Sequence, residues 1–205
     1  KYDLSKNEIL FLEKKYNLNI KKKNIPNLIV ESLKKNKVIG LFQGRMEFGP
    51  RALCNRSIIY HCFDKEINLS LNQRLDRYEF MPFAPIVADK YCQKAFKNIS
   101  KKETSGKFMT MTYECTKIMK KNCPAAIHVD GTARPQIITR KNNLLMHKVL
   151  LKWKKETNQI GLLNTSFNHH EEPIVCTPED AIKSFIRNNT DVLIINNLEV
   201  IKNDD

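Results

Sequence analysis

Three arginines, Arg45, Arg51 and Arg56, lie close together in the chain, with two glycines, Gly44 and Gly49, beside and between them. Glycine lets backbone N–H groups approach an oxyanion. Arginine supplies a planar fork of donors that matches phosphate or carboxylate. Because arginines at this spacing repel one another, we expect an anion or a neighbouring acidic side chain among them. The competing interpretation is a set of structural ion pairs on a solvated surface.

Two further polar loops have complementary chemistry. The loop 130–136 contains Asp130 and Arg134, and the loop 164–168 offers amides and a hydroxyl. Each follows a predicted strand, and ligands of open sheets bind where strand ends meet loops. We therefore expect these loops and the arginine-rich loop to form one site that grips a phosphate and a planar carbonyl or base. Asp130 could hold an arginine, help to bind a metal–nucleotide, or only cap its own loop.

Nothing in the sequence predicts a nucleophilic triad or a metal centre. Ser166 could contact a phosphate, but it lacks an identifiable base. Asn164 and Asn168 could equally be turn residues. The five histidines show no HExxH spacing, and consecutive residues such as those at 169–172 chelate poorly from a strand because neighbours point to opposite faces. His128 is interpreted as a core or strand residue.

Mixed helical and strand patterns must position these loops. An apolar run over Val38–Phe42 predicts a buried strand before the arginines. Alternation predicts a strand over 108–113, and another is expected over 127–130. Near the start, Ser5 opens a capping box and a helix, and a lysine-rich linker, Lys21–Asn24, follows. This mixture predicts an α/β or α+β domain built around a sheet.

Composition narrows the class of protein. At 205 residues, the chain suits one domain, or one domain with a small appendage. A formal net charge of +13 attracts nucleotides, phosphorylated substrates, nucleic acid or an acidic partner. Without an apolar run of roughly 20 residues or a secretory signal, we expect a cytoplasmic protein that does not cross a membrane.

The six cysteines are scattered and include no CxxC pair. This spacing argues against a zinc site and against a disulfide scaffold, so reduced thiols are expected. Cys54 lies beside charged residues and is the best candidate for a reactive thiol, although a small apolar filler is the simpler interpretation.

The segment Gln43–Ser57, QGRMEFGPRALCNRS, resembles the signature of the C-terminal domain of the NodU/CmcH carbamoyltransferases. The resemblance continues through PFAP at Pro82–Pro85, HVDGTARPQ at His128–Gln136, LLNTSFN at Leu162–Asn168 and EPIV at Glu172–Val175. It implies a YrdC-like fold, which is a twisted mixed sheet flanked by helices. Such a domain would occupy residues 27–205, after an N-terminal helix and basic linker over residues 1–26.

The resemblance also implies a reaction. The domain would bind carbamoyl phosphate and ATP, with Mg²⁺, and form a carbamoyl-adenylate for O-carbamoylation of a hydroxyl acceptor. Arg45, Arg51 and Arg134 would hold the phosphate groups, and Ser166 and Asn168 match a Ser-x-Asn element near the nucleotide. The remaining candidates for binding substrate or nucleotide are Arg56, Arg77, Asp130 and Asn164.

In this family an N-terminal domain binds the acceptor and a metal, and nothing in this chain matches that domain. We therefore expect the chain to be a trimmed or C-terminal piece that works with such a domain or with a separate subunit. The sequence does not name the acceptor, and a homodimer is compatible with it.

Four residues depart from the family pattern. Cys54 and Glu171 stand where glycine is usual, Tyr78 replaces a glutamate and Met81 replaces an arginine. These changes support a second hypothesis, a degenerate YrdC-like module that binds nucleotide or, less favoured, RNA without turnover. A third hypothesis is an interaction domain that docks on a separate acceptor-binding subunit.

Overall fold

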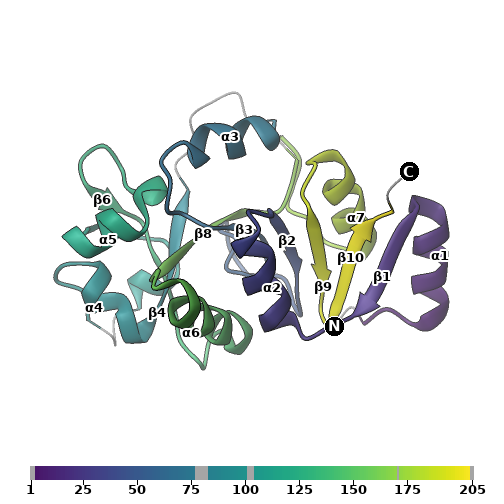
Figure 1. Cartoon of the computed structure of the whole chain (residues 1–205), viewed down its shortest axis with the longest axis horizontal. Helices are drawn as coiled ribbons and strands as arrows, with labels where there is room; N and C mark the ends of the chain where they lie inside the picture. Colours follow the sequence, from purple (N-terminus) through teal and green to yellow (C-terminus); the bar gives the residue numbers. More distant parts are fainter. Residues whose placement is uncertain (1–2, 77–82, 101–103, 170, 204–205) are drawn as a thin grey trace.

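The computed structural model describes residues 3–76, 83–100, 104–169 and 171–203. Within these residues, eight strands form one sheet in the order β1-β10-β9-β2-β3-β8-β4-β7 (Figure 1). Neighbouring strands run antiparallel except for the parallel pairs β2·β9 and β4·β7. The strands are β1 (Leu18–Lys22), β2 (Ile39–Phe42), β3 (Arg56–Tyr60), β4 (Ala84–Ala88), β7 (Gln136–Ile138), β8 (Gly161–Ser166), β9 (Val192–Ile195) and β10 (Leu198–Lys202).

Helices cover both faces of the sheet, and a small two-stranded sheet, β5 (Tyr113–Glu114) with β6 (Thr132–Ala133), lies beside it. The α-helices are α1 (Lys6–Tyr16), α2 (Ile25–Lys34), α3 (Ile67–Arg74), α4 (Cys92–Ala95), α5 (Lys117–Asn122), α6 (Leu144–Thr157) and α7 (Pro178–Arg187). Three 3₁₀ turns complete the elements: η1 (Asp89–Tyr91), η2 (Ser105–Lys107) and η3 (Pro124–Ala126).

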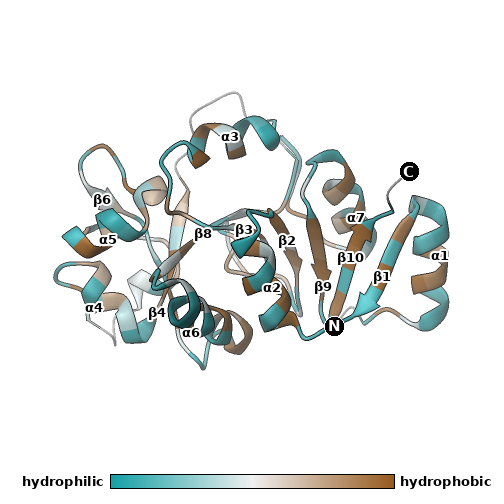
Figure 2. Cartoon of the chain, viewed as in Figure 1, coloured by the Kyte–Doolittle hydropathy of each residue, from teal (hydrophilic) through white to brown (hydrophobic). Residues whose placement is uncertain are grey.

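The alternation of side chains along β2 explains the two cores. Ile39 and Leu41 point to the face covered by α2 and α6, where Trp153 is buried. Phe42 points to the opposite face and belongs to the core that includes Phe185 of α7. Since both faces are buried, the central strands are hydrophobic throughout, as the brown colour of β2 and β9 in Figure 2 shows. The α/β architecture predicted from the sequence is confirmed.

The N-terminal segment belongs to the same sheet. Ser5 begins α1 with the predicted capping box, in which its backbone N–H donates to Glu8 Oε2 at 2.8 Å. The lysine-rich linker predicted over Lys21–Asn24 is wrong for Lys21 and Lys22. Both lie in β1, which pairs antiparallel with β10. Backbone pairing with a strand from the far end of the chain gives no local sequence signal.

Two other predicted strands are turns. In the segment 108–113 only Tyr113 is in a strand, because Met109 adopts a left-handed backbone with φ of 55°. In the segment 127–130, the N–H of Gly131 donates to the carbonyl of His128 at 2.9 Å and closes a turn. The φ of 81° at Gly131 suits glycine. Local turn chemistry therefore overrides the strand pattern at both places.

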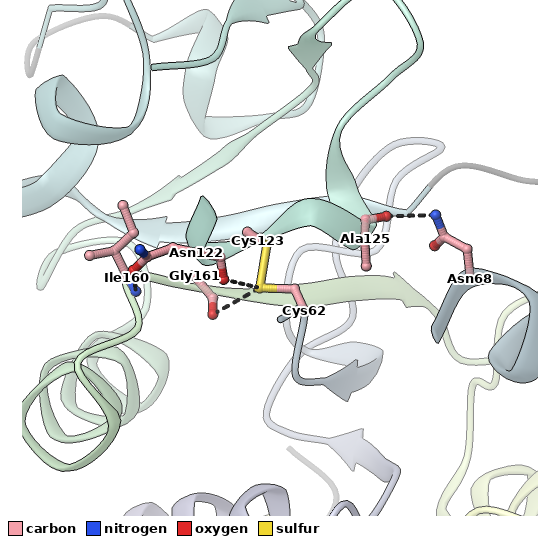
Figure 3. The surroundings of a disulfide bond; sticks show 7 residues. All are labelled: Cys62, Asn68, Asn122, Cys123, Ala125, Ile160 and Gly161. Carbon is pink, nitrogen blue, oxygen red and sulfur yellow. Dashed lines mark hydrogen bonds between the residues drawn. A yellow bond between two sulfur atoms is a disulfide. The ribbon is translucent and has the colours of Figure 1, made fainter. Parts of the chain in front are cut away.

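A disulfide joins Cys62, which follows β3, to Cys123, which follows α5 (Figure 3). The expectation of reduced thiols is wrong for this pair; the two cysteines are 61 positions apart in the sequence, and no sequence motif connects them. Hydrogen bonds reinforce the junction: the Asn68 amide donates to the Ala125 carbonyl at 2.7 Å, and the N–H of Ala125 donates to the Cys62 carbonyl at 3.3 Å. The junction anchors the segment that leads to Arg134.

Across the described ranges, the helices are too short or too polar for any one of them to traverse a lipid bilayer.

Candidate functional site

The arginine-rich loop connects β2 to β3, and one carboxylate oxygen organises it. Glu47 Oε1 accepts hydrogen bonds from the backbone N–H groups of Leu53, Asn55 and Arg56 at 2.6, 2.8 and 3.0 Å. The N–H of Gln43 also donates to the Asn55 carbonyl at 2.8 Å and closes the base of the loop. Glu47 therefore lies among the arginines, as expected, but it binds the backbone and folds the loop.

Arg56 has a structural position. Its side chain is 0% exposed, and its guanidinium lies 3.5 Å from the centre of the Phe42 ring. The guanidinium donates to the carbonyl oxygens of Gln43, Gly44 and Asn55 at 2.9–3.0 Å. Arg56 thus holds the start of the loop against its end. A direct contact with substrate stays a prediction for this residue.

Buried amides connect the arginine-rich loop to the other two predicted loops. The Asn164 side chain on β8 donates to the Ala52 carbonyl at 2.9 Å and to Gln136 Oε1 at 2.8 Å. Gln136, the first residue of β7, also accepts from the Cys54 thiol at 3.2 Å. Asn143, which caps α6, donates to the Cys54 carbonyl at 3.4 Å. The structure therefore brings together the three loops that the sequence predicted to meet, and Asn164 lies beneath the arginine-rich loop.

Both departures from family glycines occupy left-handed backbone. The φ angle is 70° at Cys54 and 64° at Glu171, a region that glycine enters without steric cost. Burial, and after it the nearby charge of Glu47, raises the pKa of the Cys54 thiol well above its ordinary value. A buried thiol that stays protonated is a poor nucleophile. Cys54 is therefore a filler of the core and not a reactive cysteine.

A pocket of about 380 Å³ lies where the arginine-rich loop meets Arg134. It is lined by Phe48, Pro50, Arg51, Leu53, Phe108, Met109, Thr110 and Arg134. Burial, and after it the like charge of Arg51, lowers the pKa of the Arg134 guanidinium. In the part of the chain that the structure describes, no carboxylate pairs with Arg51 or Arg134, and Arg134 Nε is buried without a partner. Arg51 is exposed and Arg134 is partly buried, and two positive charges that share a pocket favour the approach of an anion.

The other predicted residues of the first two loops, Arg45 and Asp130, are exposed, as Arg51 is. Asp130 accepts hydrogen bonds from the N–H and the hydroxyl of Thr132 at 2.9 and 2.7 Å, and these bonds lower the pKa of its carboxyl group. The Thr132 hydroxyl oxygen also lies 3.1 Å from His128 Nδ1. Asp130 therefore caps its own loop, as the simpler interpretation held, and His128 lies in a turn and not in a strand.

The third loop extends from the end of β8. Ser166, the last residue of β8, pairs with Ser57 and is half-buried. Asn168 donates to the carbonyl oxygens of His169 and Glu172 at 2.9 Å and accepts, through its own carbonyl, from Asn188. Asn168 is therefore a turn residue in this structure. The predicted site residue Arg77, and the departures Tyr78 and Met81, fall outside the described residues.

Fold and site together define an α/β domain in which two arginines from different loops, Arg51 and Arg134, line one pocket. The model of the carbamoyltransferase C-terminus family matches residues 30–202. The chain belongs to this family, which confirms the resemblance drawn from the sequence motifs.

Curated relatives are much longer than this chain. An uncharacterized protein of Methanocaldococcus jannaschii is 39% identical over 171 residues, which are 83% of this chain and 27% of that protein. Nodulation protein NolO of Bradyrhizobium diazoefficiens is 38% identical over 159 residues, 77% of this chain and 29% of NolO. Nodulation protein U of Sinorhizobium fredii is 33% identical over 138 residues, 67% of this chain and 24% of that protein. The chain thus spans under a third of each of these three proteins.

Solved structures show the same fold. Full-length HypF in a phosphate- and nucleotide-bound form matches 88% of this chain and 26% of HypF, with a TM-score of 0.59 and 20% identity. HypF from T. kodakarensis matches 92% of the chain and 24% of that HypF, with a TM-score of 0.61 and 13% identity. A variant of Sua5 from P. abyssi matches 78% of the chain and 43% of that protein, with a TM-score of 0.53 and 7% identity. The fold is YrdC-like, as the resemblance implied.

Several residues of the pocket were not predicted from the sequence. Phe108, Met109 and Thr110 line it, but their alternating pattern predicted a strand. Phe48 lay inside the recognised motif and was given no role. The available signal for Phe48 was an aromatic residue next to a glycine and between two arginines. For the segment 108–110 no such signal existed, because its approach to Arg134 depends on the tertiary fold.

Proposed function

We propose that this domain binds carbamoyl phosphate and MgATP and forms a carbamoyl-adenylate. The observation that carries the proposal is the pair Arg51 and Arg134, which share one pocket without a carboxylate partner among the described residues. The domain belongs to a carbamoyltransferase family, and a protein of the same fold was solved with phosphate and nucleotide bound. The arginine pair supports an anion in this pocket, and the other two observations support phosphorylated ligands for a domain of this kind.

The proposed chemistry needs no protein nucleophile. Water cleaves the bond between the carbamoyl oxygen and phosphorus, and releases phosphate and carbamate. A carbamate oxygen then attacks the α-phosphorus of ATP, and pyrophosphate leaves. Such transfers are accelerated mainly by alignment and by neutralising developing negative charge. Arg51 and Arg134 would supply that charge from two different loops, and Arg45 would reach the ligand from the exposed part of its loop.

Mg²⁺ would enter as part of the nucleotide substrate. The residues described as lining the pocket include no carboxylate, whereas Mg²⁺ is commonly held by substrate phosphates together with carboxylates and waters. This donor set favours a metal ion carried by the ATP phosphates over one held by the pocket itself. The function of the arginines is then to bind the remaining charge and to fix the orientation of the phosphates.

Transfer to a hydroxyl acceptor would need more than this chain. The relatives contain long regions that the chain does not match. Among the described residues, the pocket beside Arg134 has a volume of about 380 Å³, which is small for an acceptor bound together with ATP. We therefore assign activation to this domain. Acceptor recognition is assigned to an N-terminal domain or a separate subunit.

Titration calorimetry with carbamoyl phosphate and with MgATP tests the site. Removing one charge-assisted contact costs roughly 1.5–3 kcal/mol, so Arg134→Ala should weaken ligand binding about 10- to 150-fold. Arg140→Ala is the matched control, because Arg140 is exposed and lies just after β7. Equal affinities for the two variants would reject this pocket as the anion site.

A further inference from the structure

The pocket that holds the two arginines also presents two aromatic rings. Phe48 is fully exposed and Phe108 is 47% exposed, although both are large apolar side chains. They come from different loops, one between β2 and β3 and the other after η2, and both line the pocket with Arg51 and Arg134. Single exposed apolar residues need no explanation. Two exposed rings that line the same pocket as two arginines do, because both are open to solvent beside the proposed anion site.

The segment that carries Phe108 is held firmly in an unusual conformation. Met109 has φ of 55° and is only 5% exposed. Two hydrogen bonds fix the turn around it: the N–H of Phe108 and the hydroxyl of Thr110 both donate to the Ser105 carbonyl, at 3.3 and 3.0 Å. Left-handed backbone at a residue other than glycine is costly and persists where the surroundings impose it, often at binding sites. The fold thus fixes Phe108 at the wall of the pocket.

We propose that Phe48 and Phe108 form the base-binding part of the site, where the purine of the nucleotide stacks while Arg51 and Arg134 hold its phosphates. This inference rests on the proposed function and adds the residues that would bind the base. Aromatic side chains bind bases through their π faces, and each stacked base contributes a substantial part of the affinity. Arginines beside the rings bind phosphate and can also stack on a base.

The test compares a nucleotide with an anion that has the same phosphates and no base. ATP and inorganic tripolyphosphate are titrated into the chain and into Phe48→Leu and Phe108→Leu, which keep an apolar side chain and remove the ring. Phe11→Leu is the matched control, because Phe11 is 59% exposed on α1 and is not among the residues that line this pocket. We expect each pocket variant to bind ATP about ten-fold or more weakly, with tripolyphosphate binding unchanged.

The outcomes separate this inference from the proposed function. Retained tripolyphosphate binding shows that a variant is folded and that its arginines are in place. If the pocket variants then bind ATP as tightly as Phe11→Leu does, or if the original chain binds ATP no more tightly than tripolyphosphate, the base site is rejected while the anion site stands. If the original chain binds neither ligand, the proposed function itself fails.

Discussion

Replacing Glu47 tests how the site is built. One of its carboxylate oxygens accepts three backbone N–H groups of the arginine-rich loop, at 2.6–3.0 Å. Glu47→Ala removes the acceptor from all three donors at once. Glu47→Gln keeps an oxygen for the three donors, removes the charge and places an amide NH2 where Oε2 is buried without a hydrogen-bond partner among the described residues. The two variants therefore separate the hydrogen-bond geometry from the electrostatic contribution.

The size of the effect follows from those three bonds. A hydrogen bond to a charged group contributes roughly 1.5–3 kcal/mol, but one oxygen serves all three donors and water can reach part of the loop. We therefore expect Glu47→Ala to lower the free energy of unfolding by about 3 kcal/mol. Glu47→Gln should cost about half as much, because bonds to an ionised acceptor are roughly twice as strong as neutral ones.

Urea unfolding of the three proteins measures this, with Glu66→Ala as the control. Glu66 is exposed, and its side chain makes no hydrogen bond with the residues that the structure describes, so its loss should cost under about 0.5 kcal/mol. Tripolyphosphate binding should fall in Glu47→Ala, because Arg51 loses its fixed loop. A Glu47→Ala variant as stable as Glu66→Ala would refute the assignment of Glu47 as the organiser of the loop.

Three further predictions concern buried groups. Cys176 is exposed and Cys54 is buried, so a thiol reagent should label Cys176 quickly and Cys54 only on unfolding; equal labelling rates, read by mass spectrometry, would contradict this. The disulfide between Cys62 and Cys123 closes a loop of 61 residues. Its reduction should lower the free energy of unfolding by about 4 kcal/mol. An unchanged urea midpoint in the presence of reductant would contradict this prediction. Burial lowers the pKa of His61 to about 4, whereas the unfolded histidine titrates near 6.5. The free energy of unfolding should therefore fall by about 2 kcal/mol between pH 6.5 and pH 4, because the unfolded state binds the proton more readily. His61→Phe should lose this pH dependence.

Much of the fold could be predicted because local patterns and burial agree. The Val38–Phe42 run was recognised as a strand because its residues are apolar on both faces of the sheet. The capping box at Ser5 gave a clear helix start. By contrast, β1 was missed because its partner, β10, lies at the other end of the chain.

The meeting of the three loops could be predicted from the sequence, but the arrangement of their side chains could not. Clustered arginines and glycines pointed to an anion, and Arg51 and Arg134 do share a pocket. The sequence could not show that Arg56 turns inward to bind carbonyl oxygens, since the same side chain suits both uses. Nor could it reveal the left-handed backbone at Met109, which lies in a turn closed by hydrogen bonds to the Ser105 carbonyl.

Carbamoyl-phosphate-dependent exchange of labelled pyrophosphate into ATP is the most direct test of the proposed activation. The exchange requires both the pocket and the reversible formation of a carbamoyl-adenylate. We expect exchange that depends on carbamoyl phosphate, is lost in Arg134→Ala and is retained in Arg140→Ala. Absence of exchange in the original chain, with ATP still bound, would contradict an active domain and would support a nucleotide-binding module without turnover.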